Sequence, residues 1–182
     1  WLLLNPGQHR ETLALVNALD RLTMMLKVGS IDPTARERRF IALTSQIGPR
    51  SRITELSRLT VEPALRRDCQ QNLRSRTLQY KRYASYVLSR ASLLLAGADE
   101  PVTGKTIEHV LPRNPPGDAQ WRAEFASDRI VDDHTHRLGN LVLLSFRDNQ
   151  AAANLDFEAK REILGGSEYA IARDAAKEAI WT

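Results

Sequence analysis

Two blocks of sequence decide the fold: Ile107-Glu108-His109-Val110-Leu111-Pro112 and, after a long loop, His136-Arg137-Leu138-Gly139-Asn140-Leu141-Val142-Leu143-Leu144. The first block predicts a short β-strand that ends before Pro112, because proline is excluded from the middle of a sheet. The second predicts an apolar strand entered through a turn at Gly139 and followed by an alanine-containing helix after Ser145. The order strand, loop, strand and helix predicts a compact unit with an acid, an imidazole and amides at its joints.

The residue types at these joints suit the hydrolysis of a phosphodiester. A neutral histidine can act as a general base near pH 7. A hard cation such as Mg²⁺ prefers oxygen ligands, which a carboxylate and an amide supply. Adjacent residues of an ideal strand point to opposite faces, so Glu108 and His109 can serve one site only where the strand ends or bulges. Pro112 is consistent with such an end.

Together the two blocks resemble the HNH, or ββα-metal, nuclease signature. The pattern continues through Asn149, Asn154, Phe157 and Lys160, and in this longer form it is most similar to the C-terminal nuclease domain of GmrSD-type restriction enzymes, with SspE-like phage-defence nickases as relatives. The motif covers about a third of the chain. The resemblance implies a mainly α protein with a small ββα-metal module: a helical bundle plus a two-stranded antiparallel hairpin and helix.

The resemblance also implies a role for each matching residue. His109 is the expected general base, and Asn140 is expected to tie down the loop and orient that base. Glu108 and Asn149 are the expected ligands of one Mg²⁺ or Mn²⁺ ion. Basic side chains bind backbone oxygens without reading sequence, and the expected contacts to phosphate or DNA are His136, Arg137, Asn154 and Lys160.

Cysteine usage excludes two kinds of structural support. Many HNH proteins add a zinc knuckle whose cysteines flank the second strand and the helix, but the corresponding positions here are Ser145 and Asp148. The only cysteine is Cys69, far upstream. We therefore expect neither a structural zinc site nor a disulfide framework. A single cysteine also indicates a reducing compartment, and the resemblance to restriction enzymes implies that this is the bacterial cytoplasm.

Apolar residues at helical spacing predict further helices. Asp32 followed by Pro33 predicts an N-cap with proline in the first helical position. Residues 113–133 predict a long loop with a functional insert, part of it helical. The predicted helices cover residues 8–27, 33–47, 63–73, 76–96, 157–164 and 167–181. We expect two domains: a basic helical bundle at residues 1–98, a candidate scaffold for docking DNA, and the nuclease module with its C-terminal helices at residues 99–182.

Charge is divided unequally along the chain. Residues 1–100 contain 16 Lys and Arg against 9 Asp and Glu, a net charge of +7, whereas residues 101–182 contain 10 against 13, a net charge of −3. A basic field attracts a polyanion, although scattered helical arginines also form solvated faces. Because an acidic nuclease half needs help in holding a phosphate backbone, DNA is the expected partner.

Two features concern regions outside this chain. The sequence contains no Gly-rich phosphate loop, so the nucleotide-dependent sensor that the resemblance implies is expected on an N-terminal domain or subunit missing from this chain. The first residue is not Met, which indicates a fragment of a longer protein or a processed chain. The apolar run at residues 1–4 stops at Pro6 and is too short for a membrane span, so no membrane partner is expected.

The resemblance, together with these features, implies a metal-dependent HNH endonuclease that nicks or cleaves DNA, in restriction or anti-phage defence against foreign or modified DNA. An isolated Glu-His pair at a strand end is usually a solvated turn, and it is the joint spacing with Asn140 and Asn149 that favours a nuclease. Two alternatives stay open: a catalytically inactive DNA-binding or scaffold module of the same fold, and an RNA-cleaving toxin.

Overall fold

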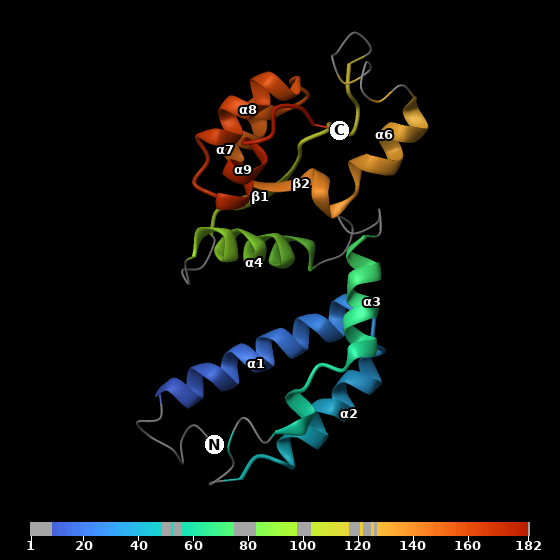
Figure 1. Ribbon diagram of the computed structural model, residues 1–182, viewed down its shortest axis with the longest axis vertical. Coiled ribbons are helices and arrows are strands. Elements are labelled where there is room, and N and C mark those ends of the chain that lie inside the picture. Colours follow the sequence, from blue (N-terminus) through green and yellow to red (C-terminus); the bar gives the residue numbers. More distant parts are fainter. Residues whose placement is uncertain are drawn as a thin grey trace. The chain divides into compact units, whose positions relative to one another are not determined.

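The computed structural model describes residues 9–48, 52, 56–74, 83–97, 103–116, 121, 125 and 127–181. The chain divides into two compact units, Trp1–Leu73 and Arg74–Thr182, and each is described by itself (Figure 1). This division lies earlier than the expected boundary at residue 98. The helix α4 (Ala84–Ala96) packs against elements of the second unit, and this contact assigns it there.

The first unit is helical. It contains α1 (His9–Val28), α2 (Pro33–Thr44), the 3₁₀ turn η3 (Ser57–Leu59) and α3 (Pro63–Leu73). The predicted cap of α2 is confirmed, because the Asp32 carboxylate accepts hydrogen bonds from the main-chain N–H groups of Thr34 and Ala35 at 2.8 and 3.1 Å. α1 packs against α3, and the core is made of apolar side chains that include Leu15, Leu22, Leu26, Leu43, Leu59, Leu65 and Cys69.

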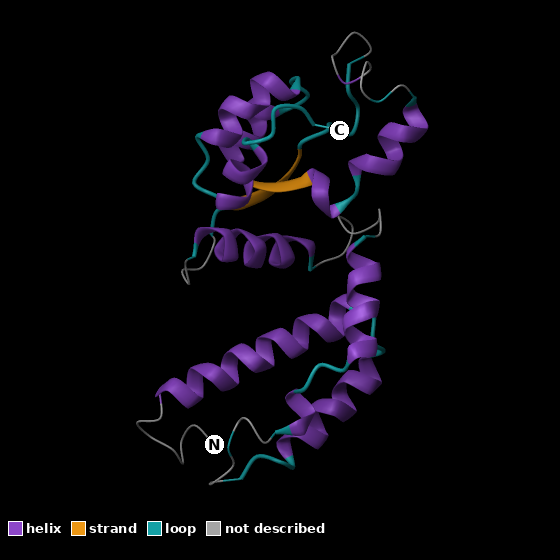
Figure 2. Cartoon of the chain, viewed as in Figure 1, coloured by secondary structure: helices purple, strands orange, loops and turns teal. Residues whose placement is uncertain are grey.

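The second unit holds a two-stranded sheet surrounded by helices (Figures 1 and 2). In chain order its elements are α4, β1 (Lys105–His109), α6 (Asp128–Thr135), η5 (Leu138–Asn140), β2 (Leu141–Ser145), α7 (Phe146–Ala152), α8 (Phe157–Gly165) and α9 (Ala170–Ala175). β1 and β2 pair antiparallel, from Lys105 opposite Ser145 to His109 opposite Leu141. The predicted fold class, mainly α with a small antiparallel hairpin followed by a helix, is confirmed.

Both faces of β2 are buried, which explains its continuous apolar sequence. Leu141 and Leu143 pack with Leu88 of α4 and with Tyr169. Val142 and Leu144 belong to the larger core on the other face, together with Val110, Leu111, Trp121, Phe125, Phe157 and Leu164. In the register of the sheet Glu108 lies opposite Val142 and His109 opposite Leu141. The acid and the imidazole therefore leave β1 on opposite faces.

The helices differ from the predictions at several ends. α2 stops at Thr44, short of residue 47. The predicted helix over residues 76–96 is described only from Ala84, since residues 75–82 lie outside the described residues. The expected helical part of residues 113–133 is confirmed, because α6 begins at Asp128.

The predicted C-terminal helix over residues 167–181 is wrong in its extent, because α9 covers only Ala170–Ala175. The chain turns after Ala175, and the indole N–H of Trp181 donates to the Asn140 side chain at 3.0 Å. A straight helix advances about 1.5 Å per residue and would carry Trp181 away from that partner.

Among the described helices, none combines the length and the apolar character that a membrane crossing requires.

Candidate active site

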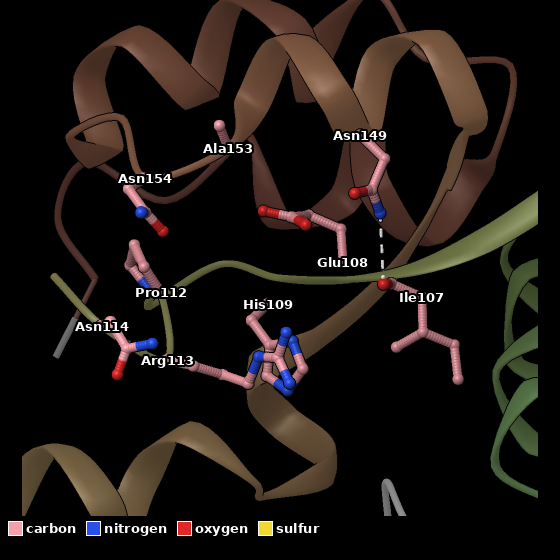
Figure 3. A pocket seen from close by; sticks show the side chains of 9 residues that line it. All are labelled: Ile107, Glu108, His109, Pro112, Arg113, Asn114, Asn149, Ala153 and Asn154. Carbon is pink, nitrogen blue, oxygen red and sulfur yellow. Dashed lines mark hydrogen bonds between the residues drawn. The ribbon is translucent and has the colours of Figure 1, made fainter.

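The end of β1 opens into a cavity of about 570 Å³ in the second unit. Glu108 and His109 both line it, although they point to opposite faces of the strand. The strand ends at His109, as the sequence predicted, so the cavity can reach around its end to both side chains. The other lining residues are Ile107, Pro112, Arg113, Asn114, Asn149, Ala153 and Asn154 (Figure 3).

Asn149 is brought to this cavity by α7. The helix starts where the Ser145 hydroxyl accepts a hydrogen bond from the N–H of Asp148 at 3.1 Å. One turn later, the Asn149 side-chain NH₂ donates to the Ile107 carbonyl at 3.1 Å. Because a carbonyl can only accept, this bond fixes which end of the amide is nitrogen. The amide oxygen is turned toward Glu108 (Figure 3).

Glu108 forms a buried ion pair with Lys160 of α8. The Lys160 ammonium lies 2.5 Å from Glu108 Oε1 and 2.7 Å from the main-chain oxygen of His109. The Lys160 residue has 0% exposure and Glu108 has 7%. The sequence predicted that Lys160 would contact phosphate at the surface. Its ammonium lies instead inside the protein, where it supports the acid.

Burial and pairing act in opposite directions on this ion pair. Burial raises the pKa of the Glu108 carboxyl, and the attraction of Lys160 opposes that rise. Burial likewise lowers the pKa of the Lys160 ammonium, against the attraction of Glu108. A buried charge is tolerated only when it is paired and hydrogen-bonded. Each partner therefore depends on the other.

His109 is neutral at physiological pH. Burial, and then the positive charges of Arg113, His136 and Lys160, lower the pKa of the His109 imidazole from 6.5 to about 4. The His136 ring meets the His109 ring edge-on, with centroids 5.8 Å apart and an interplanar angle of 78°. The two histidines of the motif are thus brought together, and His109 keeps the unprotonated form that a general base requires.

The lowered pKa of His109 gives a testable pH dependence of stability. The unfolded chain takes up a proton on this imidazole below pH 6.5, whereas the folded chain resists it until about pH 4. Since the unfolded state binds more protons in that window, stability is lost as the pH falls through it. We expect the free energy of unfolding, measured in urea, to drop more between pH 7 and pH 4.5 for the wild type than for His109→Gln. Parallel pH curves for the two proteins would contradict a His109 held neutral by the fold.

Asn140 lies beside the cavity without lining it, with its side chain fully engaged. Its Oδ1 accepts from the Leu111 N–H at 2.7 Å and from the Trp181 indole at 3.0 Å. Its NH₂ donates to the carbonyls of Leu111 and Thr135, each at 2.9 Å. The residue therefore ties the segment just after His109 to the end of α6. This arrangement suits a positioning residue rather than one that touches substrate.

Two predicted site residues remain, Asn154 and Arg137. Asn154 lines the cavity and is exposed. Arg137 is exposed but lines a different pocket, and its Nε–H donates to the Asp133 carbonyl at 2.9 Å.

Sequence reasoning missed Arg113 and Asn114, both exposed on the cavity wall. Their position directly after Pro112, where the chain has left the strand but not yet the site, was the signal that could have found them.

Comparison with protein families gives a direct match to this part of the chain. Residues 59–182 match the family model described as the C-terminal domain of GmrSD restriction endonucleases. The chain belongs to this family. The resemblance stated from the motifs is thereby confirmed, and the matched region contains the whole second unit together with α3 of the first. Searches of curated proteins and of solved structures found no match.

Membership in the GmrSD C-terminal family makes this a nuclease-type domain, and the donor groups of its site decide which metal it suits. Among the described residues, no group of three or more His, Cys, Asp or Glu side chains is placed to hold a metal ion. The cavity is lined by one carboxylate, that of Glu108, and by the side-chain amides of Asn114, Asn149 and Asn154, of which the Asn149 oxygen is turned toward Glu108. This donor set is poor for zinc but fits a hard cation such as Mg²⁺ that keeps several waters.

Proposed function

We propose that this domain is a metal-dependent endonuclease that hydrolyses DNA phosphodiesters at the end of β1. The observation that supports it best is that the neutral His109 lines the same cavity as the Glu108 carboxylate and the Asn149 amide. A base and a pair of oxygen ligands are the parts that one-metal hydrolysis of a phosphodiester needs.

In the proposed reaction His109 accepts a proton from a water molecule, and that water oxygen attacks the phosphorus. The bond from phosphorus to the 3′ oxygen breaks, and this oxygen takes up a proton from a solvent water molecule, which leaves a 5′ phosphate and a 3′ hydroxyl. Glu108 and Asn149 would hold Mg²⁺ or Mn²⁺, and the bound cation supplies charge relief on the phosphate and on the leaving oxygen. Asn140 keeps the segment after His109 in place through Leu111.

Arg113 is the basic side chain best placed to meet the scissile phosphate. It is exposed and lines the cavity. A guanidinium binds two phosphate oxygens in one plane without reading the base sequence. We assign to Arg113 the phosphate contact that the sequence had assigned to Lys160, and Asn154 lines the same cavity. His136 and Arg137 are proposed to contact other phosphates of the DNA strand.

The first unit supplies a candidate surface for binding the rest of the duplex. Residues 1–73 contain 11 Lys and Arg against 7 Asp and Glu, a net charge of +4. Arg66 and Arg67 of α3 are exposed. Phosphate contacts by such residues would raise affinity for any DNA sequence and weaken with salt.

The proposed biological context is restriction of foreign or modified DNA in the bacterial cytoplasm. A nucleotide-dependent sensor, on another domain or subunit, would provide the control that this site lacks. One active site cuts one strand, so nicking is the expected product unless two copies act together.

The proposal predicts Mg²⁺-dependent nicking of supercoiled plasmid that EDTA abolishes. Glu108→Ala and Asn149→Ala should each raise the Mg²⁺ concentration for half-maximal nicking by roughly tenfold or more, since each removes a ligand. Glu158→Ala, which removes an exposed carboxylate of α8 outside the cavity, is the matched control and should behave as wild type.

The same assay separates the alternatives. Cleavage of a matched RNA strand but not of the DNA would indicate an RNA-cleaving toxin. DNA binding without cleavage at any Mg²⁺ or Mn²⁺ concentration would indicate an inactive DNA-binding module and would overturn the proposal.

A further inference from the structure

Lys160 places a cation beside the candidate metal ligand before any metal ion arrives. It belongs to the buried stripe of α8, between Phe157 and Leu164. Its side chain has 0% exposure, and its ammonium lies 2.5 Å from Glu108 Oε1. A lysine is rarely buried this completely without a specific partner. The pair is therefore a built feature of the site.

The Lys160 ammonium bridges two consecutive residues. It donates to the Glu108 carboxylate and also to the main-chain oxygen of His109, at 2.7 Å. The first bond fixes the direction of the acid, and the second fixes the strand end that carries the imidazole. One side chain thus holds both proposed catalytic partners in place.

The same contact limits what Glu108 can offer to a metal ion. Oε1 accepts a hydrogen bond from Lys160, which leaves fewer lone pairs of the Glu108 carboxylate for coordination. The positive charge of Lys160 offsets the negative charge of the Glu108 carboxylate, and it repels a divalent cation nearby. Among the described residues, no further acid or histidine completes a metal-binding group. The negative charge that such a cation still needs has to come from the substrate phosphate.

We propose that Lys160 is a positioning residue that holds Glu108 and His109 in the absence of metal, and that the domain consequently binds its divalent cation together with the substrate phosphate rather than in advance. This inference rests on the proposed function, because it takes Glu108 as a metal ligand.

The test compares Lys160→Met with Lys177→Met in the full chain. Lys177 is the matched control: it also pairs with a carboxylate, Asp174 at 2.8 Å, but its side chain is 75% exposed. Binding of Mn²⁺ without DNA is measured from the electron paramagnetic resonance signal of the free ion. We expect Lys160→Met to bind Mn²⁺ roughly tenfold more tightly than wild type, because the repelling ammonium is gone and the cation replaces it as the partner of the Glu108 carboxylate. At saturating Mn²⁺ it should nick plasmid at least about tenfold more slowly, because the acid and the base are no longer held.

Lys177→Met should match the wild type in both measurements. A lysine with a merely structural role would lower metal binding and cleavage together, in proportion to the unfolded fraction. A folded Lys160→Met that binds Mn²⁺ no more tightly than wild type would overturn the inference while leaving the nuclease proposal intact. Tighter Mn²⁺ binding without cleavage by any variant, the wild type included, would sink the nuclease proposal and leave the hold of Lys160 on Glu108 standing.

A measurement without substitution of Lys160 covers the case in which Lys160→Met does not fold. In protein labelled with ¹⁵N-lysine, the buried ammonium of Lys160 exchanges slowly and can be told from the exposed ones. In the His109→Ala background, which prevents cleavage, we expect its resonance to shift with Mg²⁺ plus a short DNA duplex and to stay nearly unchanged with Mg²⁺ alone. If Mg²⁺ alone saturated the shift of the Lys160 resonance at concentrations as low as those needed with DNA, the inference that metal binding depends on the substrate phosphate would be overturned.

Discussion

Replacing His109 with alanine is expected to slow DNA nicking by roughly 10²–10⁴-fold, the range that a positioned general base contributes. His109 is the histidine that lines the cavity, and its pKa of about 4 keeps the ring unprotonated at pH 7. Its loss removes the proton acceptor but leaves Glu108, Asn149 and the basic surface in place. DNA affinity in Mg²⁺ should therefore stay close to that of wild type, as measured by fluorescence anisotropy.

His134→Ala provides the matched control for this loss. His134 lies on α6, where its Nδ1 is hydrogen-bonded to the Ile130 carbonyl at 2.8 Å, and it does not line the cavity. Its replacement should leave nicking unchanged. Added imidazole should also restore part of the activity of His109→Ala, because the cavity is large enough to admit it. Nicking by His109→Ala at the wild-type rate would exclude His109 as the base.

The positions of the candidate site residues along the elements were more predictable than the contacts that support them. The sequence placed Glu108, His109 and Asn149 correctly at the end of a strand and the start of a helix, because these are local signals that proline, glycine and serine mark. It also predicted that the strand must end where acid and imidazole meet. Local geometry dictates such features, and the periodicity of side chains along a strand was sufficient to find them.

Lys160 shows where sequence reasoning failed. A lysine read by itself suggests a surface contact with phosphate, yet this one is buried against Glu108, 52 residues away in the chain. That pairing depends on how α8 packs against the sheet, which local propensity does not encode. The spacing of Phe157, Lys160 and Leu164 places them on one helical face, which indicates that Lys160 shares the side of its apolar neighbours. In the structure all three are buried.

The C-terminal helix failed for a related reason. Apolar residues at helical spacing after Ser167 predicted one helix to Trp181, and Ser167 does accept a hydrogen bond from the Tyr169 N–H at 3.2 Å. Tertiary contacts override the pattern beyond Ala175, because Trp181 packs against Phe157 and bonds to Asn140. Propensity is a weak guide where a single long-range anchor decides the path of the chain.

That anchor leads to the largest expected effect on stability, for Asn140→Ala. The substitution leaves four groups without their partner: the N–H and C=O of Leu111, the carbonyl of Thr135 and the indole of Trp181. An unsatisfied buried polar group costs about 1–3 kcal/mol, so a total loss of roughly 3–5 kcal/mol is expected after partial relaxation. For a unit of this size such a loss lowers the melting temperature by more than about 10 °C.

Two further variants divide this effect among the bonds of Asn140. Trp181→Phe removes only the indole donor and should cost about 1 kcal/mol. Asn154 is exposed, so Asn154→Ala should change the free energy of unfolding by less than about 0.5 kcal/mol. Thermal and urea unfolding followed by circular dichroism give the comparison. Equal melting temperatures for Asn140→Ala and Asn154→Ala would mean that the hydrogen bonds from Asn140 to the Leu111 main chain contribute nothing to stability. The position of His109, two residues before Leu111, would then depend on β1 and Lys160 alone.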